Sequence, residues 1–151
     1  MVNKSIWGPL TWYLFHCLAY KIKPGHDYIV PVLFAYIKSL CQHLPCPECA
    51  AHAELMWAHY PYRVQTKEDL VRAVWRAHNL VNTRLGKPIM SRAKHDELYS
   101  RVPLFQVCNR YRTVMSATER SEQRLSDAFH RKRNIDDFLK FVRHNWRVFD
   151  R

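Results

Sequence analysis

Two cysteines separated by two residues form the only close pair of thiols in the chain. Cys46 and Cys49 lie in the segment 44–49, which reads Leu-Pro-Cys-Pro-Glu-Cys. This spacing serves either zinc ligation or dithiol–disulfide exchange. Zinc needs four ligands, so the first pair is usually joined by a second close pair. The chain has no second C-x-x-C, and His52 and His59 are seven residues apart, which is wider than the usual spacing of a histidine pair. We therefore favour redox chemistry, with a local structural disulfide or two buried thiols as the alternative.

The cysteine pair lies where a helix is expected to begin. Helical spacing predicts a helix from Cys46 to about Tyr60, with Pro47 in the first turn, a position that proline favours, and Pro61 after its end. Unpaired backbone N–H groups at a helix N-terminus stabilise a thiolate, which is the reacting form of cysteine. A thioredoxin would carry this motif between strands and a helix, whereas this sequence shows no convincing strand.

A second group of polar and aromatic residues shares one face of a later helix. Trp75, His78, Asn79 and Asn82 follow the spacing i, i+3, i+4, i+7. Such a face beside an apolar stripe suits an aromatic ligand with many polar edges. The alternative is a solvated helix face with satisfied amides, and each position taken alone favours that alternative.

Helical periodicity extends through most of the chain and predicts an all-α protein. Prolines, glycines and capping sequences mark the ends of the helices. The first part is expected to form a compact bundle of about 100 residues. The helices of this bundle are expected from near Pro9 to before Pro24 and over 28–43, 46–60, 67–85 and 91–102.

The sequence pattern changes after Pro103. Residues 103–116 are expected to form a loop, and a capping box at 116–119 and Asn134 each mark the start of a further helix. Two basic amphipathic helices are therefore predicted over 117–131 and 135–147. This pattern divides the chain into a domain at 1–102 and a basic helical C-terminal extension at 103–151.

The chain is strongly basic. It has 24 Lys and Arg against 13 Asp and Glu, a net charge of +11, which favours contact with polyanions. A basic helical nucleic-acid-binding module with a structural C-x-x-C is thus the alternative function. Only three glycines are present, which excludes glycine-rich phosphate-binding loops.

The sequence also bears on location. No apolar run approaches the roughly 20 residues of a membrane span, and the N-terminal segment lacks the apolar stretch of a signal peptide. We expect no membrane contact and a cytoplasmic protein.

Three blocks together resemble the ERV/ALR family of FAD-linked sulfhydryl oxidases. They read W-G-P-L-T-W at 7–12 with His16, L-P-C-P-E-C at 44–49 with His52, and H-N-L-V-N-T-R-L-G-K-P at 78–88. The resemblance implies an all-α fold, a four-helix bundle plus a short fifth helix, that binds FAD non-covalently. The small size is most similar to the forms encoded by large cytoplasmic DNA viruses, which would place the protein in the host cytoplasm or the virion.

The resemblance also implies a role for each matching residue. Cys46 and Cys49 would be catalytic, with Cys46 exchanging with substrate and Cys49 next to the flavin, and no metal is expected. The implied electron path runs from a thiol-containing protein substrate through the pair and FAD to molecular oxygen, giving hydrogen peroxide. The implied cofactor-binding residues are Gly8, Trp12, His16, Cys49, His52, His78, Asn79, Asn82, Arg84 and Lys87.

Partners follow from the same resemblance, and some family features are missing. A small thioredoxin-like protein would be a fitting redox partner, a homodimer is the family default, and nucleic acid is not expected. The family's additional disulfide would fall at Ala58 and Trp75, so it is absent here. The extension carries only Cys108 and thus no shuttle pair, while Cys17 and Cys41 are expected to be buried thiols.

Overall fold

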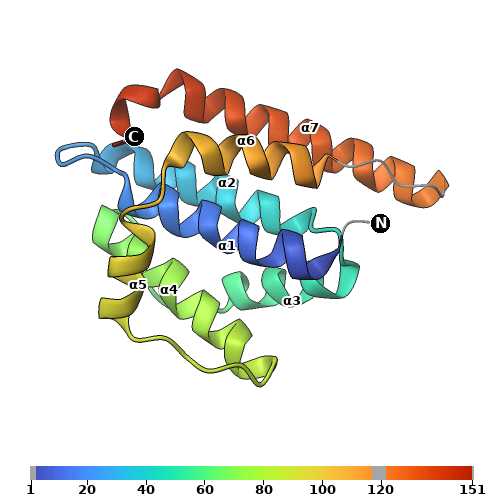
Figure 1. Cartoon of the computed structure of the whole chain (residues 1–151), viewed down its shortest axis with the longest axis horizontal. Helices are drawn as coiled ribbons and strands as arrows, with labels where there is room; N and C mark the ends of the chain where they lie inside the picture. The colour runs from blue at the N-terminus through green and yellow to red at the C-terminus, as the bar shows by residue number, and fades with distance from the viewer. Residues whose placement is uncertain (1–2, 117–121, 151) are drawn as a thin grey trace.

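The computed structural model describes residues 3–116 and 122–150, and its secondary structure is almost entirely helical (Figure 1). An antiparallel bridge between Ile22 and Phe149 is isolated, and no strand occurs in the described ranges. The predicted all-α class is confirmed. The α-helices are α1 (Lys4–Tyr20), α2 (Val30–Gln42), α3 (Pro47–Ala58), α4 (Lys67–Arg84), α5 (Arg92–Tyr99), α6 (Leu104–Met115) and α7 (Glu122–His144), with 3-10 turns at Asp27–Ile29 and Trp146–Val148.

Helix α1 is the centre of the molecule. It packs against α4 and α5 on one side and against α6 on the other, while α2 packs against α3 and α7. In Figure 1, α6 and α7 lie side by side above α1 and α2, and α3, α4 and α5 lie below. Leu14, Phe15 and Leu18 of α1 are fully buried and join one apolar core that also includes side chains of α6 and α7.

The start of the first helix differs from the expectation at Pro9. Helix α1 begins at Lys4, because the side chain of Asn3 accepts a hydrogen bond from the backbone N–H of Ser5 and caps the helix. Pro9 therefore lies inside α1. Pro9 is the sixth residue of α1, beyond the first turn, and because proline has no N–H it cannot donate the helical bond to the carbonyl of Ser5.

The predicted loop at 103–116 is wrong, because these residues form α6. The apolar side chains of α6 recur at helical spacing on one buried face, a period that the sequence reading missed. Most of the expected capping box at 116–119 lies outside the described residues. The buried side chains of α6 are Leu104, Val107, Cys108, Tyr111 and Met115.

The two helices predicted over 117–131 and 135–147 are also wrong, since α7 is continuous from Glu122 to His144. Asn134 does not cap a helix. Its side-chain oxygen instead accepts a hydrogen bond from the hydroxyl of Ser39 on α2 at 3.0 Å. A tertiary contact therefore takes the side chain that the sequence reading assigned to a local cap. The division at 102/103 stays a prediction.

Buried aromatic packing holds α7 on the bundle. Ile135, Phe138 and Val142 are buried on one face of α7, and Tyr36 of α2 contacts the rings of Phe138 and Phe141. None of the described helices combines the length and apolarity that a membrane span requires.

We predict that Phe138→Ala lowers the free energy of unfolding by about 3–5 kcal/mol, because it removes a fully buried ring. Phe129→Ala is the matched control, since Phe129 lies on the same helix with 61% of its surface exposed, and it should change stability by less than about 0.5 kcal/mol. Urea unfolding followed by circular dichroism measures both. Equal losses would contradict this packing of α7.

Three cysteines lie in the core as free thiols, as predicted for Cys17 and Cys41. Burial raises the pKa of Cys17 and Cys41 to about 11 and that of Cys108 to about 12. Cys17 also donates a hydrogen bond to the carbonyl of Val102. Buried, protonated thiols are poor nucleophiles.

We therefore predict that iodoacetamide at pH 8 modifies two cysteines of the reduced, folded protein and none of the oxidised form. Mass spectrometry of the tryptic peptides should find the label at Cys46 and Cys49 alone. Labelling under denaturing conditions should reach all five cysteines. Fast labelling of Cys17, Cys41 or Cys108 in the folded protein would contradict their burial.

Candidate functional site

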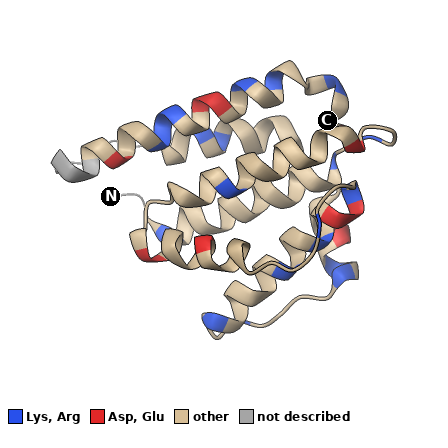
Figure 2. Ribbon diagram, turned by 180° about the vertical axis from the view of Figure 1, so that it is seen from behind, with Lys and Arg blue, Asp and Glu red and all other residues tan. Residues whose placement is uncertain are grey.

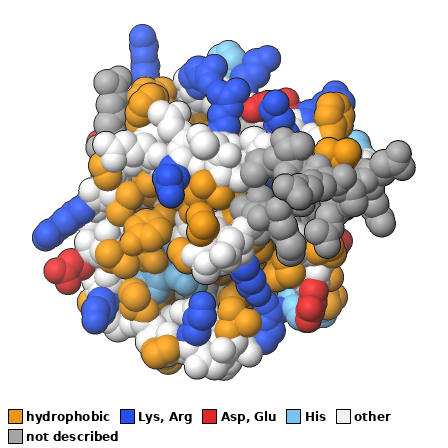
Figure 3. All heavy atoms as spheres, turned by 45° about the vertical axis from the view of Figure 1, so that its right-hand side comes forward, with side chains coloured by type: hydrophobic (Ala, Val, Ile, Leu, Met, Phe, Trp, Pro, Cys, Tyr) orange, Lys and Arg blue, Asp and Glu red, His pale blue; other side chains and the backbone are white. Residues whose placement is uncertain are grey.

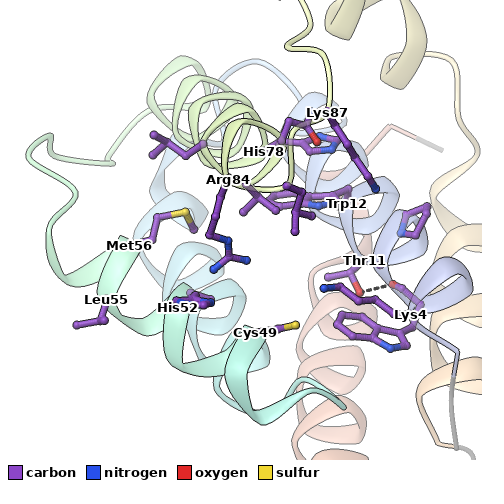
Figure 4. Close-up of a pocket in the computed structure, with 18 of the residues that line it drawn as sticks. Lys4, Thr11, Trp12, Cys49, His52, Leu55, Met56, His78, Arg84 and Lys87 are labelled. Carbon is purple, nitrogen blue, oxygen red and sulfur yellow. Dashed lines mark hydrogen bonds between the residues drawn. The ribbon is translucent and has the colours of Figure 1, made fainter.

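A cavity of about 1080 Å³ opens between α1, α3 and α4. Its volume is at the upper end for ligand sites, and its lining is mainly apolar with a few polar groups. Figure 3, which brings the right-hand side of Figure 1 forward, shows apolar side chains gathered around histidine, with Lys and Arg at the margins. The close-up in Figure 4 shows residues from all three helices directed into one space.

The cysteine pair spans the first turn of α3. Cys46 and Cys49 form a disulfide. Cys46 is the N-cap residue, and its sulfur accepts a hydrogen bond from the backbone N–H of Cys49 at 3.2 Å. Cys49 lines the cavity, whereas Cys46 is partly exposed outside the lining. Cys49 thus faces the cavity, as Figure 4 shows, whereas the half-buried Cys46 lies outside the lining at the start of the helix.

An aromatic wall faces the cysteines from α1 and α4. The rings of Trp12 and His78 stack with centroids 4.3 Å apart and planes 8° from parallel. Behind them, Nε2 of His16 lies 2.9 Å from Nδ1 of His78, within hydrogen-bond distance. Burial lowers the pKa of His16 well below its usual value and that of His78 to about 4. Both imidazoles are therefore neutral near pH 7.

His95 of α5 completes a cluster that the sequence reading missed. The ring nitrogens of His16, His78 and His95 lie within 4.8 Å of one another. His95 is fully buried, and among the described residues neither of its ring nitrogens has a hydrogen-bond partner. Its shared face with Tyr99, one turn later, was the only signal in the sequence. Imidazoles of this kind can bind transition metals, and among the described residues this cluster consists of three histidines without a carboxylate or a thiolate.

Asn79 and Trp75 hold the segment that follows α4. The amide of Asn79 donates to the carbonyl of Met90 at 2.9 Å and accepts from the N–H of Met90 at 3.0 Å. The indole N–H of Trp75 donates to the same carbonyl at 2.9 Å. Gly86, with φ of 70°, lets the chain turn there. Because the segment is pinned at Met90, Lys87 is held at the mouth of the cavity.

Three cations border the cavity. Lys4 of α1, Arg84 of α4 and Lys87 all line it, and Figure 4 shows the guanidinium of Arg84 directed between α4 and α3. Among the described residues, no acidic side chain belongs to this lining. A ligand that carries phosphate groups would therefore meet complementary charge.

The structure brings most of the predicted site residues together. His16 and Asn79 lie behind the lining, where they contact His78 and Met90 respectively. The lining also contains Lys4 and Tyr99, which the sequence reading did not select. The predicted residues in the lining are Gly8, Trp12, Cys49, His52, His78, Asn82, Arg84 and Lys87.

The comparisons with known proteins agree with this geometry. A relative from African swine fever virus, named FAD-linked sulfhydryl oxidase, is 30% identical over 95 residues, which cover 62% of this chain and 79% of the relative. A protein of Invertebrate iridescent virus 6, named "Putative FAD-linked sulfhydryl oxidase 347L", is 31% identical over 101 residues. The match covers 59% of this chain and 87% of that protein. The Erv1 / Alr family model matches residues 9–100, more than half of the chain. The chain therefore belongs to the Erv1 / Alr family.

Proposed function

We propose that this protein is an FAD-dependent thiol oxidase that forms disulfide bonds in protein substrates. One observation carries the proposal. The two cysteines of one helical turn differ in position, with Cys49 in the cavity lining and Cys46 partly exposed outside it. Family membership and the names of the viral relatives support the same activity.

The cavity suits FAD in both shape and charge. The stacked rings of Trp12 and His78 offer an aromatic surface, and the neutral imidazoles can hydrogen-bond without adding charge. Arg84 and Lys87 would bind the phosphates. His16 and Asn79 would act from behind the lining, by holding His78 and the segment at Met90. When bound, FAD supplies the acceptor for two electrons and passes them to oxygen, which yields hydrogen peroxide.

The disulfide performs the exchange with substrate. A substrate thiolate attacks the sulfur of Cys46, the Cys46–Cys49 bond breaks, and Cys49 leaves as a thiolate. A second, deprotonated substrate thiol then attacks the substrate sulfur of the mixed disulfide and releases Cys46. The substrate leaves as a disulfide, and the cysteine pair keeps the two electrons. The backbone N–H of Cys49 donates a hydrogen bond to the sulfur of Cys46, and it stabilises the Cys46 thiolate released in this second step.

The partners follow from this chemistry. The substrate is a thiol-bearing protein, for which a small thioredoxin-like protein is our candidate, and the final acceptor is molecular oxygen. A homodimer and a cytoplasmic or virion location are also part of the proposal. Because α6 and α7 already cover one side of α1 and α2, a second copy would dock on another surface.

Charge does not favour the nucleic-acid alternative. Figure 2 shows Lys and Arg distributed over several helices and interspersed with Asp and Glu. A nucleic-acid interface usually gathers its cations on one face. The known relatives give this alternative no support.

We predict that the purified protein is yellow, is bleached by dithiothreitol without oxygen, and regains its colour in air. Serine at Cys46 or at Cys49 should abolish oxygen consumption with dithiothreitol while FAD stays bound, because exchange needs both sulfurs. Cys108→Ser, which changes a buried thiol of α6, should keep activity. Substantial turnover in both active-site variants would refute this mechanism.

We also predict that Arg84→Gln or Lys87→Gln raises the Kd for FAD by roughly tenfold, the size expected for one lost charge-assisted hydrogen bond. Arg110→Gln, an exposed site on α6, is the control and should leave the Kd within twofold. Fluorescence titration of the FAD-free protein measures each value, and raising the salt concentration should narrow the difference. Unchanged affinity in both cavity variants would show that the phosphates lie elsewhere.

A further inference from the structure

Helix α7 runs antiparallel to α2. Its first half lies near the end of α2, from which the chain continues to Cys46. The oxygen of Asn134 accepts from the hydroxyl of Ser39 at 3.0 Å. Three residues earlier in α7, Nε of Arg131 donates to the carbonyl of His43 at 2.8 Å. Moving towards the start of α7 thus means moving towards the end of α2 and on to Cys46. Figure 1 shows this half of α7 extending beyond the body of the bundle, at the end where α3 begins.

The same register places the next turn of α7 beyond His43, at the end of the bundle where the chain continues to the reactive disulfide. Cys46 follows His43 by only three residues, so the bond of Arg131 to His43 ties this part of α7 to the segment that leads into the cysteine pair. The electrostatics of His43 agree: burial lowers its pKa, His130 and Arg131 lower it further, and Asp127 raises it. These side chains of α7 are therefore close to the segment that leads into the cysteine pair.

Residues 125–133 combine exposed apolar groups with positive charge. Leu125 and Phe129, one helical turn apart, expose 42% and 61% of their surfaces. The run 130–133 reads His-Arg-Lys-Arg, and Asp127 is the only acidic residue in the segment. Arg131 is buried and anchors α7 through its bond to His43, while Lys132 and Arg133 are exposed.

We propose that residues 125–133 of α7 are a docking surface for the protein substrate of Cys46, and that they select a thiol-bearing segment with acidic and apolar residues near its cysteine. The inference rests on the proposed oxidase function and names its substrate class. Charge complementarity favours an acidic partner over a second copy of a chain with net charge +11. The surface lies outside the residues 9–100 that match the family, so it would give this protein a preference of its own.

The test compares two matched charge reversals on one helix in the full-length protein with FAD. Lys132→Glu with Arg133→Glu changes the proposed surface, and Lys140→Glu with Arg143→Glu makes the same change further along α7, at exposed sites. The substrates are a C-x-x-C peptide with flanking Glu and Leu, the same peptide with Lys in place of Glu, and dithiothreitol. Oxygen consumption gives kcat/KM for each.

We expect the first double variant to lower kcat/KM for the acidic peptide, relative to that for dithiothreitol, at least tenfold, mainly through KM, and to favour the Lys peptide. The second should shift this ratio less than twofold. Salt should weaken the preference of the parent protein for the acidic peptide, because exposed charges are screened. Equal effects of the two double variants would overturn the docking surface and leave only the general charge of the protein.

A binding measurement separates this proposal from the oxidase function itself. Fluorescence anisotropy of the acidic peptide with serine in place of both cysteines reports docking without turnover. Phe129→Ser should raise its Kd at least threefold, and an unchanged Kd in both this variant and the first double variant would refute the docking surface. Absence of dithiothreitol oxidation by the FAD-bound parent would instead refute the oxidase function.

Discussion

The placement of the two sulfurs depends on the first turn of α3. Cys46 is the N-cap, outside the helix proper, and Cys49 is the third helical residue. A disulfide across this turn has one end in contact with the surroundings and the other on the inner side of α3. The pair can therefore connect outside and cavity only because α3 packs on α2 and faces α1 and α4 across the cavity.

Helix α4 performs three tasks with three of its faces. Leu70, Val74 and Ala77 are buried in the core, and His78 presents its ring to the cavity. Asn79, on a third face, holds the returning chain at Met90. Any rotation of α4 would disturb all three contacts together. The capping box of Thr66 and Asp69 and the ion pair of Arg92 on α5 with Glu68 fix the start of this helix.

The C-terminal extension is built into the bundle. Leu104, Tyr111 and Met115 of α6 are buried in the same core as α1. The chain end returns to the turn after α1, where the N–H of Lys23 donates to the carbonyl of Val148 at 2.8 Å. Arg131 then ties α7 to the carbonyl of His43, just before the cysteine pair. The part of the chain outside the family match thereby reaches the edge of the reactive site.

Much of the architecture was present in local patterns of the sequence. Apolar periodicity and capping residues predict the α4 helix to within one residue, because its start and stop signals are contiguous. The same reasoning fails at 103–116, where it predicts a loop after Pro103 although the apolar residues recur with the period of α6. It also fails at Asn134, whose side chain bonds Ser39 of another helix instead of capping its own.

The sequence by itself determined the reactive pair, the helical class and the blocks that carry the family resemblance, since these depend on neighbours in the chain. Only the tertiary structure decided which residues meet around the cavity. His95 joins His16 and His78 from a different helix, and Lys4 reaches the cavity mouth opposite Arg84. His16 and Asn79 support the lining from behind. Such contacts arise from the packing of helices far apart in the chain, which no local period encodes.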